Sequence, residues 1–265
     1  MFVMVFGLRV FFLVLARDAS LLDRKLSELD SFGYPYVVVC GERVNHPNVV
    51  YRAPRGKYDA INFGLRFVPE NVDVVALNDV DTEIQNFNEA LRFMSEVGAD
   101  LVFAKVSVKD GPQIMFYAIL DAIRRRLPIA ASGELMLVKR EFLERITPLD
   151  GCKAEDSYIL FKVLEKGGKT AFCEKCFVIT KRTSIAEQEE VYKRRTTGGI
   201  YQALSMCRPP ILVRLFYMLL PFISPLLLLT GKKGFYWTKG IVLGFVDYLR
   251  GDRTAYWKPF YSKYV

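Results

Sequence analysis

The stretch VDVVALNDVD (residues 72–81) joins an apolar run directly to two acidic residues. The run Val72–Leu77 is short and rich in β-branched residues, which predicts a buried strand of a parallel sheet. Asp79 and Asp81 follow directly after this strand. Ligands bind beyond the carboxyl ends of the strands in open α/β sheets, so we expect both acids at a ligand-binding edge.

The chain on both sides of this stretch alternates between predicted strands and helices. One predicted strand ends at Leu15, and others cover Tyr36–Val39, Val49–Arg52 and Leu101–Ser107. Predicted helices cover Lys57–Val68 and Phe87–Val97. A further predicted helix is capped by Ser20 and has Leu22, Leu26 and Leu29 on one face. This alternation predicts an α/β fold with a Rossmann-like, mostly parallel sheet flanked by helices on both faces.

The N-terminal run Met1–Ala16 is apolar apart from Arg9 and has the length of a signal peptide. It is rich in Val and Phe, lacks a small-x-small cleavage site, and leads into a polar loop and an amphipathic helix. We therefore predict that it forms a buried strand of the sheet.

The formal net charge of +8 indicates an anionic partner, which can be a nucleic acid, a phosphorylated ligand or a membrane surface. A nucleic-acid-binding surface would mix basic and aromatic residues on one face. The basic residues instead stand at predicted helix ends and beside apolar runs. We therefore predict no nucleic-acid partner.

The five cysteines form an odd set without a disulfide framework, which fits a reducing compartment. Cys173 and Cys176 form a lone CxxC pair, and a zinc site would need a second ligand pair. The only histidine, His46, lies in a turn-like context, so catalysis through histidine is not expected.

Acidic residues at two places are candidates for chemistry. Asp79 and Asp81 offer oxygen ligands to one Mg²⁺ or Mn²⁺, leaving positions for diphosphate oxygens and water. Glu155 and Asp156 open a predicted helix, where acidic residues also stabilise the helix dipole without any catalytic role. Both interpretations of this second pair remain open from the residues alone.

Basic residues at two predicted helix ends also allow two interpretations. Arg194 and Arg195 precede a pair of glycines and either bind phosphate or form a charged helix end. The apolar helix Gln113–Leu127 ends in three arginines, which either complement its dipole in water or lie on a membrane surface.

Taken together, these motifs resemble the family-2 glycosyltransferases, which include dolichyl-phosphate mannose synthases and the cellulose and hyaluronan synthases. The resemblance covers about residues 8–204 and follows the family's order of motifs. Its matches are the loop Ala16-Arg17-Asp18, the stretch Gly56–Gly64 with Lys57, the metal-binding Asp79-Val80-Asp81, the pair Glu155-Asp156, and Arg194-Arg195-Thr196 at the family's Gln-x-x-Arg-Trp.

The resemblance implies a glycosyltransferase-A fold and an inverting hexosyltransferase that uses a nucleotide-sugar donor. It implies that Asp156, with Glu155 beside it, acts as the catalytic base, and that Asp79 and Asp81 hold Mg²⁺ or Mn²⁺. The expected contacts of the nucleotide sugar are Ala16, Arg17, Asp18, Glu42, Lys57, Asp79, Arg194 and Arg195.

Two departures from the family pattern narrow the expected activity. The family has an aspartate pair after the second strand, where this chain has Cys40-Gly41-Glu42, so Glu42 alone can serve there. Thr196 stands in place of the tryptophan of processive members, which favours transfer of one or a few sugars. We lean toward mannose from GDP-mannose and a lipid-phosphate or lipid-linked acceptor. The alternatives are a UDP-sugar-dependent, cellulose-synthase-like transferase and a non-catalytic relative.

The C-terminal region is far more apolar than the rest. Ile211–Leu229 contains one charged residue, Arg214, and is long enough to cross about 30 Å of hydrocarbon. After a short turn, the segment Phe235–Leu249 is shorter and contains two charged residues. We predict a transmembrane hairpin of two helices. The alternatives are a buried hairpin and a second segment that lies in the membrane interface.

The hydropathy change predicts a catalytic domain over residues 1–204 and a membrane anchor over 205–265. Trp237 and Trp257 both lie in this anchor, as interfacial belts predict. Nucleotide sugars are made in the cytoplasm, so we expect a multi-pass protein of the cell membrane with a cytoplasmic catalytic domain. The basic residues near the chain end are broadly consistent with that orientation.

Overall fold

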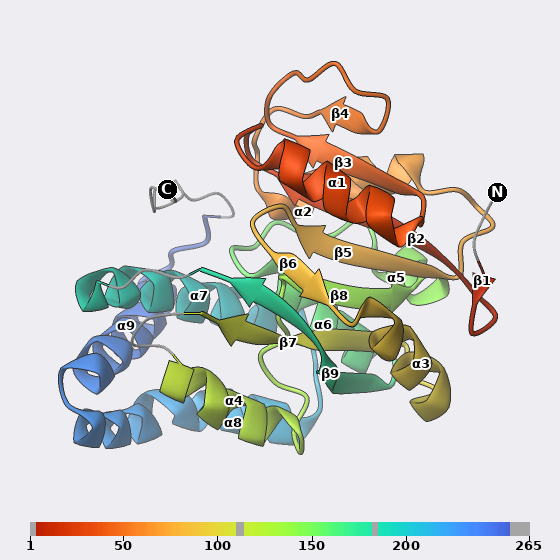
Figure 1. Ribbon diagram of the computed structural model, residues 1–265. Coiled ribbons are helices and arrows are strands. Elements are labelled where there is room, and N and C mark those ends of the chain that lie inside the picture. Colours follow the sequence, from red (N-terminus) through yellow and green to blue (C-terminus); the bar gives the residue numbers. More distant parts are fainter. Residues whose placement is uncertain (1–3, 110–113, 182–184, 255–265) are drawn as a thin grey trace. The chain divides into compact units, whose positions relative to one another are not determined.

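The computed structural model describes residues 4–109, 114–181 and 185–254 (Figure 1). The chain divides into two compact units. Unit 1 comprises Met1–Ser107, Ala131–Asp150 and Gly167–Thr180, and unit 2 comprises Val108–Ala130, Gly151–Lys166 and Lys181–Val265. The predicted division at residue 204 rests on hydropathy and stays a prediction.

Unit 1 is built on one sheet. Its strands are β1 (Met4–Val5), β2 (Leu8–Ala16), β3 (Tyr36–Cys40), β4 (Val49–Tyr51), β5 (Val74–Asp79), β6 (Glu83–Gln85), β7 (Leu101–Val108), β8 (Leu135–Lys139) and β9 (Thr170–Thr180). They lie in the order β4-β3-β2-β5-β8-β7-β9-β6, with β1 on β2. Strands β2 to β5 are parallel, whereas β8 runs antiparallel to both β5 and β7. The predicted α/β fold is confirmed, and within the N-terminal run Leu8–Ala16 forms a mostly buried strand of the sheet.

Helices cover both faces of this sheet (Figure 1). They are α1 (Leu22–Phe32), α2 (Lys57–Gly64) continued by η1 (Leu65–Phe67), α3 (Phe87–Val97) and α5 (Arg140–Ile146). On one face the ring of Phe12 lies 4.6 Å from that of Phe87 and stacks on Phe32. On the other face a Cβ on Gly64 would overlap the side chains of Leu13 and Val39. Glycine thus lets α2 approach the sheet closely, which fixes where its first residue, Lys57, lies.

The strand register places three strand ends at one edge. Leu15 pairs with Asp79, and Ala16 pairs with Cys40. The loops after β2, β3 and β5 therefore start side by side, as the sequence predicts. The predicted helix cap is wrong in detail, because α1 begins after Leu21 and Ser20 binds the carboxylate of Asp18 instead.

Unit 2 is helical. Its elements are α4 (Ile114–Arg124), α6 (Glu155–Glu165), α7 (Ala186–Met206), α8 (Ile211–Ile223), η2 (Ser224–Thr230) and α9 (Lys232–Leu249). Arg124 is not a solvated helix end, because its side chain is buried and lies 3.2 Å from Asp121.

The closest helix pair of unit 2 is α7 with α9. A Cβ on Gly240 would lie 2.7 Å from the carbonyl oxygen of Glu190, and one on Gly244 would overlap that of Arg194. Salt bridges join Glu187 to Lys232, Glu190 to Lys239 and Arg194 to Asp247, at 2.9, 2.8 and 2.5 Å. Their common order along both helices shows that α7 and α9 run in the same direction.

This packing changes the expected membrane hairpin. In the part of the chain that the structure describes, one helical segment, Ile211–Thr230, is long and apolar enough to span a membrane. The second predicted span is not confirmed, since α9 carries Lys239 and Asp247 in ion pairs with α7. Trp237 is buried, stacks on Phe116 and donates its indole N–H to Glu189, which corrects its expected interfacial place. Trp257 lies outside the described residues.

The glycine contact between α7 and α9 yields a stability prediction. Gly244→Ala forces a methyl group against the backbone of α7, so we expect a loss of about 1–3 kcal/mol in the free energy of unfolding. Gly198→Ala, on the α7 side, meets its nearest atom at 3.3 Å. Its overlap is mild and offset by a helix-propensity gain of about 1 kcal/mol. Urea unfolding measures both, and equal effects of the two substitutions would contradict this account of the packing.

Candidate functional site

The loops after β2 and β3 are joined by hydrogen bonds at the carboxyl edge of the sheet. The Gly41 amide donates to the Ala16 carbonyl at 3.0 Å, and the Ala19 amide donates to the Glu42 carboxylate at 3.0 Å. A Cβ on Gly41 would overlap the Arg17 carbonyl, so only glycine fits there. The structure thus brings together the predicted nucleotide contacts Ala16, Arg17, Asp18 and Glu42.

The loop after β5 presents Asp79 and Asp81 at the same edge. The Val80 amide donates to the Leu15 carbonyl at 3.0 Å, and the Thr82 hydroxyl donates to the Asp79 carbonyl at 2.8 Å. These bonds hold a tight turn that places both carboxylates beyond the strand end. Asp81 is half-buried.

Asp79 and Lys57 form the central ion pair of unit 1. The Lys57 ammonium, at the first residue of α2, donates to Asp79 Oδ2 at 2.5 Å. Asp79 Oδ1 is buried and has no hydrogen-bond partner among the residues that the structure describes. Burial raises the pKa of Asp79 to about 7, opposed by Lys57 and reinforced by the charges of Asp81 and Glu134. A cation bound at this buried oxygen would favour the charged form of the Asp79 carboxylate.

A buried lysine, Lys25, binds the loop after β5 from inside the fold. The Lys25 ammonium, in α1, donates to Asn78 Oδ1 at 3.0 Å, to the Thr82 carbonyl at 2.6 Å and to the Glu28 carboxylate at 2.6 Å. The second oxygen of Glu28 accepts the Ile84 amide. Lys25 is fully buried, and burial lowers its pKa while Glu28 raises it. This network fixes both ends of the turn that carries Asp79 and Asp81.

Sequence reasoning missed Lys25, although a signal for it exists. Leu22, Lys25, Leu26 and Leu29 share one helix face by their spacing, and all four are buried. A lysine on an apolar stripe must bury its charge and therefore needs partners inside the fold. Asn78, at the end of a buried strand, is such a partner.

The carboxylates at this edge fit a divalent cation that is held partly by the protein and partly by a bound phosphate ligand. Among the residues described here, no group of three or more His, Cys, Asp and Glu side chains forms a closed metal cage. Mg²⁺ and similar ions commonly use one or two carboxylates, with phosphate oxygens and water completing the coordination. The unsatisfied oxygen of Asp79 and the neighbouring Asp81 provide this kind of half-site.

The other predicted site residues belong to unit 2. Glu155 and Asp156 form the first turn of α6, where Asp156 Oδ1 accepts the amide of Ser157 at 2.6 Å. A Cβ on Gly199 of α7 would lie 2.8 Å from the Ala154 amide nitrogen, so Gly199 packs on the start of α6, whereas Gly198 faces Gly244 of α9. Within unit 2, Gly199 and the predicted acidic pair are therefore neighbours.

The two predicted arginines have different surroundings. Arg194 makes two hydrogen bonds with the Asp247 carboxylate, at 2.5 and 2.7 Å, which raise its pKa. Arg194 is thereby shown to tie α7 to α9. Arg195 lies over the ring of Tyr192 at 5.2 Å. Both arginines stay predicted phosphate ligands.

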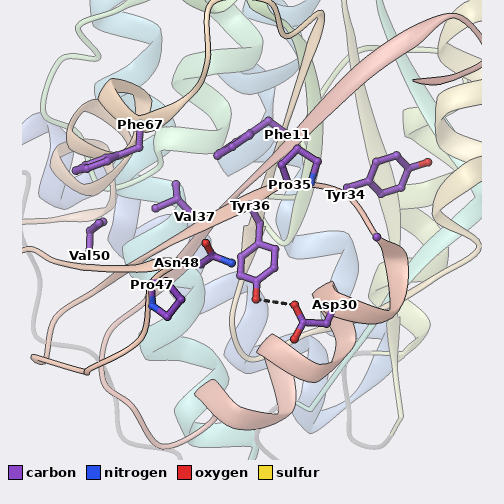
Figure 2. Close-up of a pocket in the computed structure, with 11 residues that line it drawn as sticks. Phe11, Asp30, Tyr34, Pro35, Tyr36, Val37, Pro47, Asn48, Val50 and Phe67 are labelled. Atoms are coloured by element: carbon purple, nitrogen blue, oxygen red, sulfur yellow. Dashed lines mark hydrogen bonds between the residues drawn. The ribbon is translucent and has the colours of Figure 1, made fainter. Parts of the chain in front are cut away.

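A separate cavity lies beside strands β2 and β3 (Figure 2). It measures about 660 Å³ and lies against Phe11, Tyr36 and Val37, toward the amino ends of β2 and β3. Figure 2 shows the Tyr36 hydroxyl bonded to Asp30 at 2.8 Å. The cavity contains none of the predicted site residues, so we do not assign the site to it.

The Lys25 network yields a prediction on stability and on the metal half-site. Lys25→Met leaves the Glu28 carboxylate without its buried cation, so we expect a loss of about 3–5 kcal/mol in unfolding free energy. We also expect weaker Mn²⁺ binding by the folded variant. The control is Lys139→Met, whose half-exposed pair with Asp100 contributes up to about 1 kcal/mol. Denaturant unfolding and Mn²⁺ titration by calorimetry measure these effects. Equal losses in the two variants would contradict the role given to Lys25.

Comparisons with known proteins identify the fold. No protein-family profile matches the chain, and no curated protein matches its sequence. Among solved structures, the chain is similar to a mannosyltransferase, PcManGT from Pyrobaculum calidifontis, in complex with GDP-Man and Mn²⁺. The TM-score is 0.70 at 18% identity, over 93% of this chain and 88% of that one. A second similar structure, GalNAc-T7 with UDP, GalNAc and Mn²⁺, has a TM-score of 0.49 at 15% identity, over 66% of this chain and 44% of that one. The chain therefore has the fold of the mannosyltransferase over nearly its whole length.

Proposed function

We propose that this chain is a metal-dependent, inverting glycosyltransferase that transfers a hexose from a nucleotide sugar. The observation that carries the proposal is the carboxyl edge of unit 1. There Lys57 binds Asp79 in the turn that also carries Asp81, and Asp79 Oδ1 has no hydrogen-bond partner within the described part of the chain. The shared fold with a mannosyltransferase supports the assignment.

The donor contacts follow from the geometry of this edge. Asp81 and Asp79 would hold Mg²⁺ or Mn²⁺, which supplies positive charge that stabilises the departing diphosphate. Lys57 adds a second positive charge beside Asp79. The joined loops with Arg17, Asp18 and Glu42 are proposed to contact the nucleoside. Arg194 and Arg195 are the proposed phosphate ligands of unit 2.

Asp156 is the proposed general base, with Glu155 beside it. It would accept the proton of an acceptor hydroxyl as that oxygen attacks the anomeric carbon, and the nucleoside diphosphate leaves from the opposite side. This assignment rests on the resemblance of the Glu155-Asp156 pair to the family motif and on its place at the first turn of α6.

We propose GDP-mannose as the donor and a lipid-phosphate or lipid-linked glycan as the acceptor. The fold shared with a mannosyltransferase that binds GDP-Man supports the donor. The apolar segment Ile211–Thr230 supports attachment to the cell membrane, where such an acceptor lies. We propose that the catalytic region faces the cytoplasm, where nucleotide sugars are made.

The first prediction from this proposal concerns the metal. We expect GDP-mannose binding to require Mn²⁺ or Mg²⁺, and Asp81→Ala to weaken it more than Asp79→Ala, because one oxygen of Asp79 is bound by Lys57. Calorimetric titration of GDP-mannose with Mn²⁺ and with EDTA measures this dependence. Glu83→Ala, on the strand β6 that follows, is the control. Donor binding that is equally strong in EDTA would overturn the proposed metal site.

The second prediction tests the activity itself. Purified protein should release GDP from GDP-mannose in the presence of Mn²⁺ and a lipid extract. Asp156→Asn should lower transfer by about 10²–10⁴-fold while leaving donor affinity unchanged. Glu165→Gln, at the far end of the same helix, is the matched control. Near-normal transfer by Asp156→Asn would refute the assigned base. Turnover of UDP-sugars alone would refute the assigned donor.

A further inference from the structure

The segment α8 and η2 leaves many large apolar side chains exposed, although it also packs inside unit 2. Its buried side is a stripe formed by Val213, Tyr217, Pro221 and Ser224. Its exposed side, which we call the α8 face, consists of large apolar side chains that are 42–88% exposed. They are Ile211, Leu212, Leu215, Met218, Leu219, Phe222, Ile223, Leu226, Leu228 and Leu229. A surface of this extent marks an interaction site.

Contacts along the buried stripe join this segment to the rest of unit 2. The Tyr201 hydroxyl, in α7, donates to the Tyr217 carbonyl at 2.7 Å. The Thr238 hydroxyl, in α9, donates to the Ser224 carbonyl at 2.8 Å, and Gly234 touches the carbonyl of Leu227. The segment thus lies along α7 and α9, antiparallel to α9, and its orientation in a membrane would be shared by both helices.

The charged residues of α7 and α9 determine which orientation of this segment in a membrane is energetically acceptable. The pairs Glu187–Lys232, Glu190–Lys239 and Arg194–Asp247 stand at three successive levels along these helices. The cations of the three pairs are 45–71% exposed. If α8 crossed the bilayer along its normal, these levels would lie at successive depths in the hydrocarbon. One charged residue at the centre of a spanning helix already costs about 2.5–3.5 kcal/mol.

We propose that α8 and η2 lie flat in one leaflet, and that unit 2 binds an anionic phospholipid bilayer through the α8 face. This proposal deepens the proposed membrane attachment, on which it rests, and replaces a crossing helix by a helix in the membrane plane. In this orientation only the α8 face enters the apolar layer, and the paired charges of α7 and α9 remain outside it.

The charge pattern around the α8 face names the lipid class. Arg208 and Arg214 are exposed at the start of the segment, and Lys232 and Lys233 are exposed just after its end. No acidic residue occurs between Arg208 and Val246. Cations at both ends of an in-plane helix meet headgroups of the same leaflet, and each contributes about 1 kcal/mol near an anionic surface.

The first test is binding of the full chain to vesicles of phosphatidylcholine and phosphatidylglycerol. We expect the protein to float with these vesicles, and Leu219→Asp to weaken binding at least tenfold. Leu249→Asp changes an equally exposed leucine at the end of α9 and should bind as the unchanged protein does. Equal binding by both variants would overturn the proposal. So would loss of a dimer, rather than of vesicle binding, in Leu219→Asp.

The same variants separate this inference from the proposed activity. Leu219 belongs to no proposed catalytic or donor contact, so Leu219→Asp should release GDP from GDP-mannose in detergent at the normal rate. Loss of vesicle binding with normal release supports the in-plane attachment. Absence of release in every variant, with vesicle binding intact, counts against the enzyme assignment alone.

The second test distinguishes the in-plane helix from a crossing one. A fluorophore is attached to cysteine in the variants Leu212→Cys, Leu219→Cys and Leu226→Cys, and its depth is measured with lipid-bound quenchers. The native cysteines are all buried, and the unchanged protein gives their background. We expect equal depths at the three positions. A helix along the bilayer normal would separate the first and last by about 21 Å, and a stepwise change in depth would overturn the proposal.

Discussion

The candidate site depends on the hydrogen bonds that the buried ammonium group of Lys25 donates. This group lies in the interior of unit 1, between α1 and the end of β5. Two of its three partners, Asn78 and Thr82, are the ends of the turn, and the third, Glu28, lies in α1. A buried charge is stable only with such partners, so the helix, the strand end and the turn require one another. Asp79 and Asp81 are held rigidly at the sheet edge as a result.

A second consequence concerns charge balance at that edge. Lys25 lies behind the turn and Lys57 lies beside it, so two cations compensate a cluster of acidic groups that includes Asp79, Asp81 and Glu134. One buried oxygen of Asp79 still has no hydrogen-bond partner in residues 4–109, 114–181 and 185–254. An edge of this kind is arranged to receive further positive charge together with the phosphate groups that accompany it.

Much of this arrangement was predictable from the sequence, because it depends on local patterns. The run 72–81 predicted the strand and the position of Asp79 and Asp81, and the alternation of elements predicted the parallel strands β2 to β5. The antiparallel strand β8 and the Lys25 network depend on contacts between residues about 55 positions apart or more, such as Lys25 with Asn78. Local periodicity carries no information on such pairs.

The C-terminal region shows the opposite case, where hydropathy alone did not predict the contacts between helices. The apolar length of Phe235–Leu249 suggested a span, but glycines at 240 and 244 let α9 pack on α7, and its charges pair there. Hydropathy also placed Trp237 at an interface, whereas its ring is buried on Phe116. The positions of α9 and Trp237 are determined by their contact partners, which lie on other helices of unit 2.

The central claim, that the turn Asn78–Thr82 binds a metal ion together with a nucleotide sugar, is tested most directly by a crystal structure with Mn²⁺ and GDP-mannose. The anomalous signal of manganese locates the ion independently of any assumption. The account predicts manganese within about 2.3 Å of an Asp81 oxygen, with diphosphate oxygens completing its coordination. Manganese bound elsewhere, or GDP-mannose bound away from the carboxyl ends of β2 and β5, would contradict it.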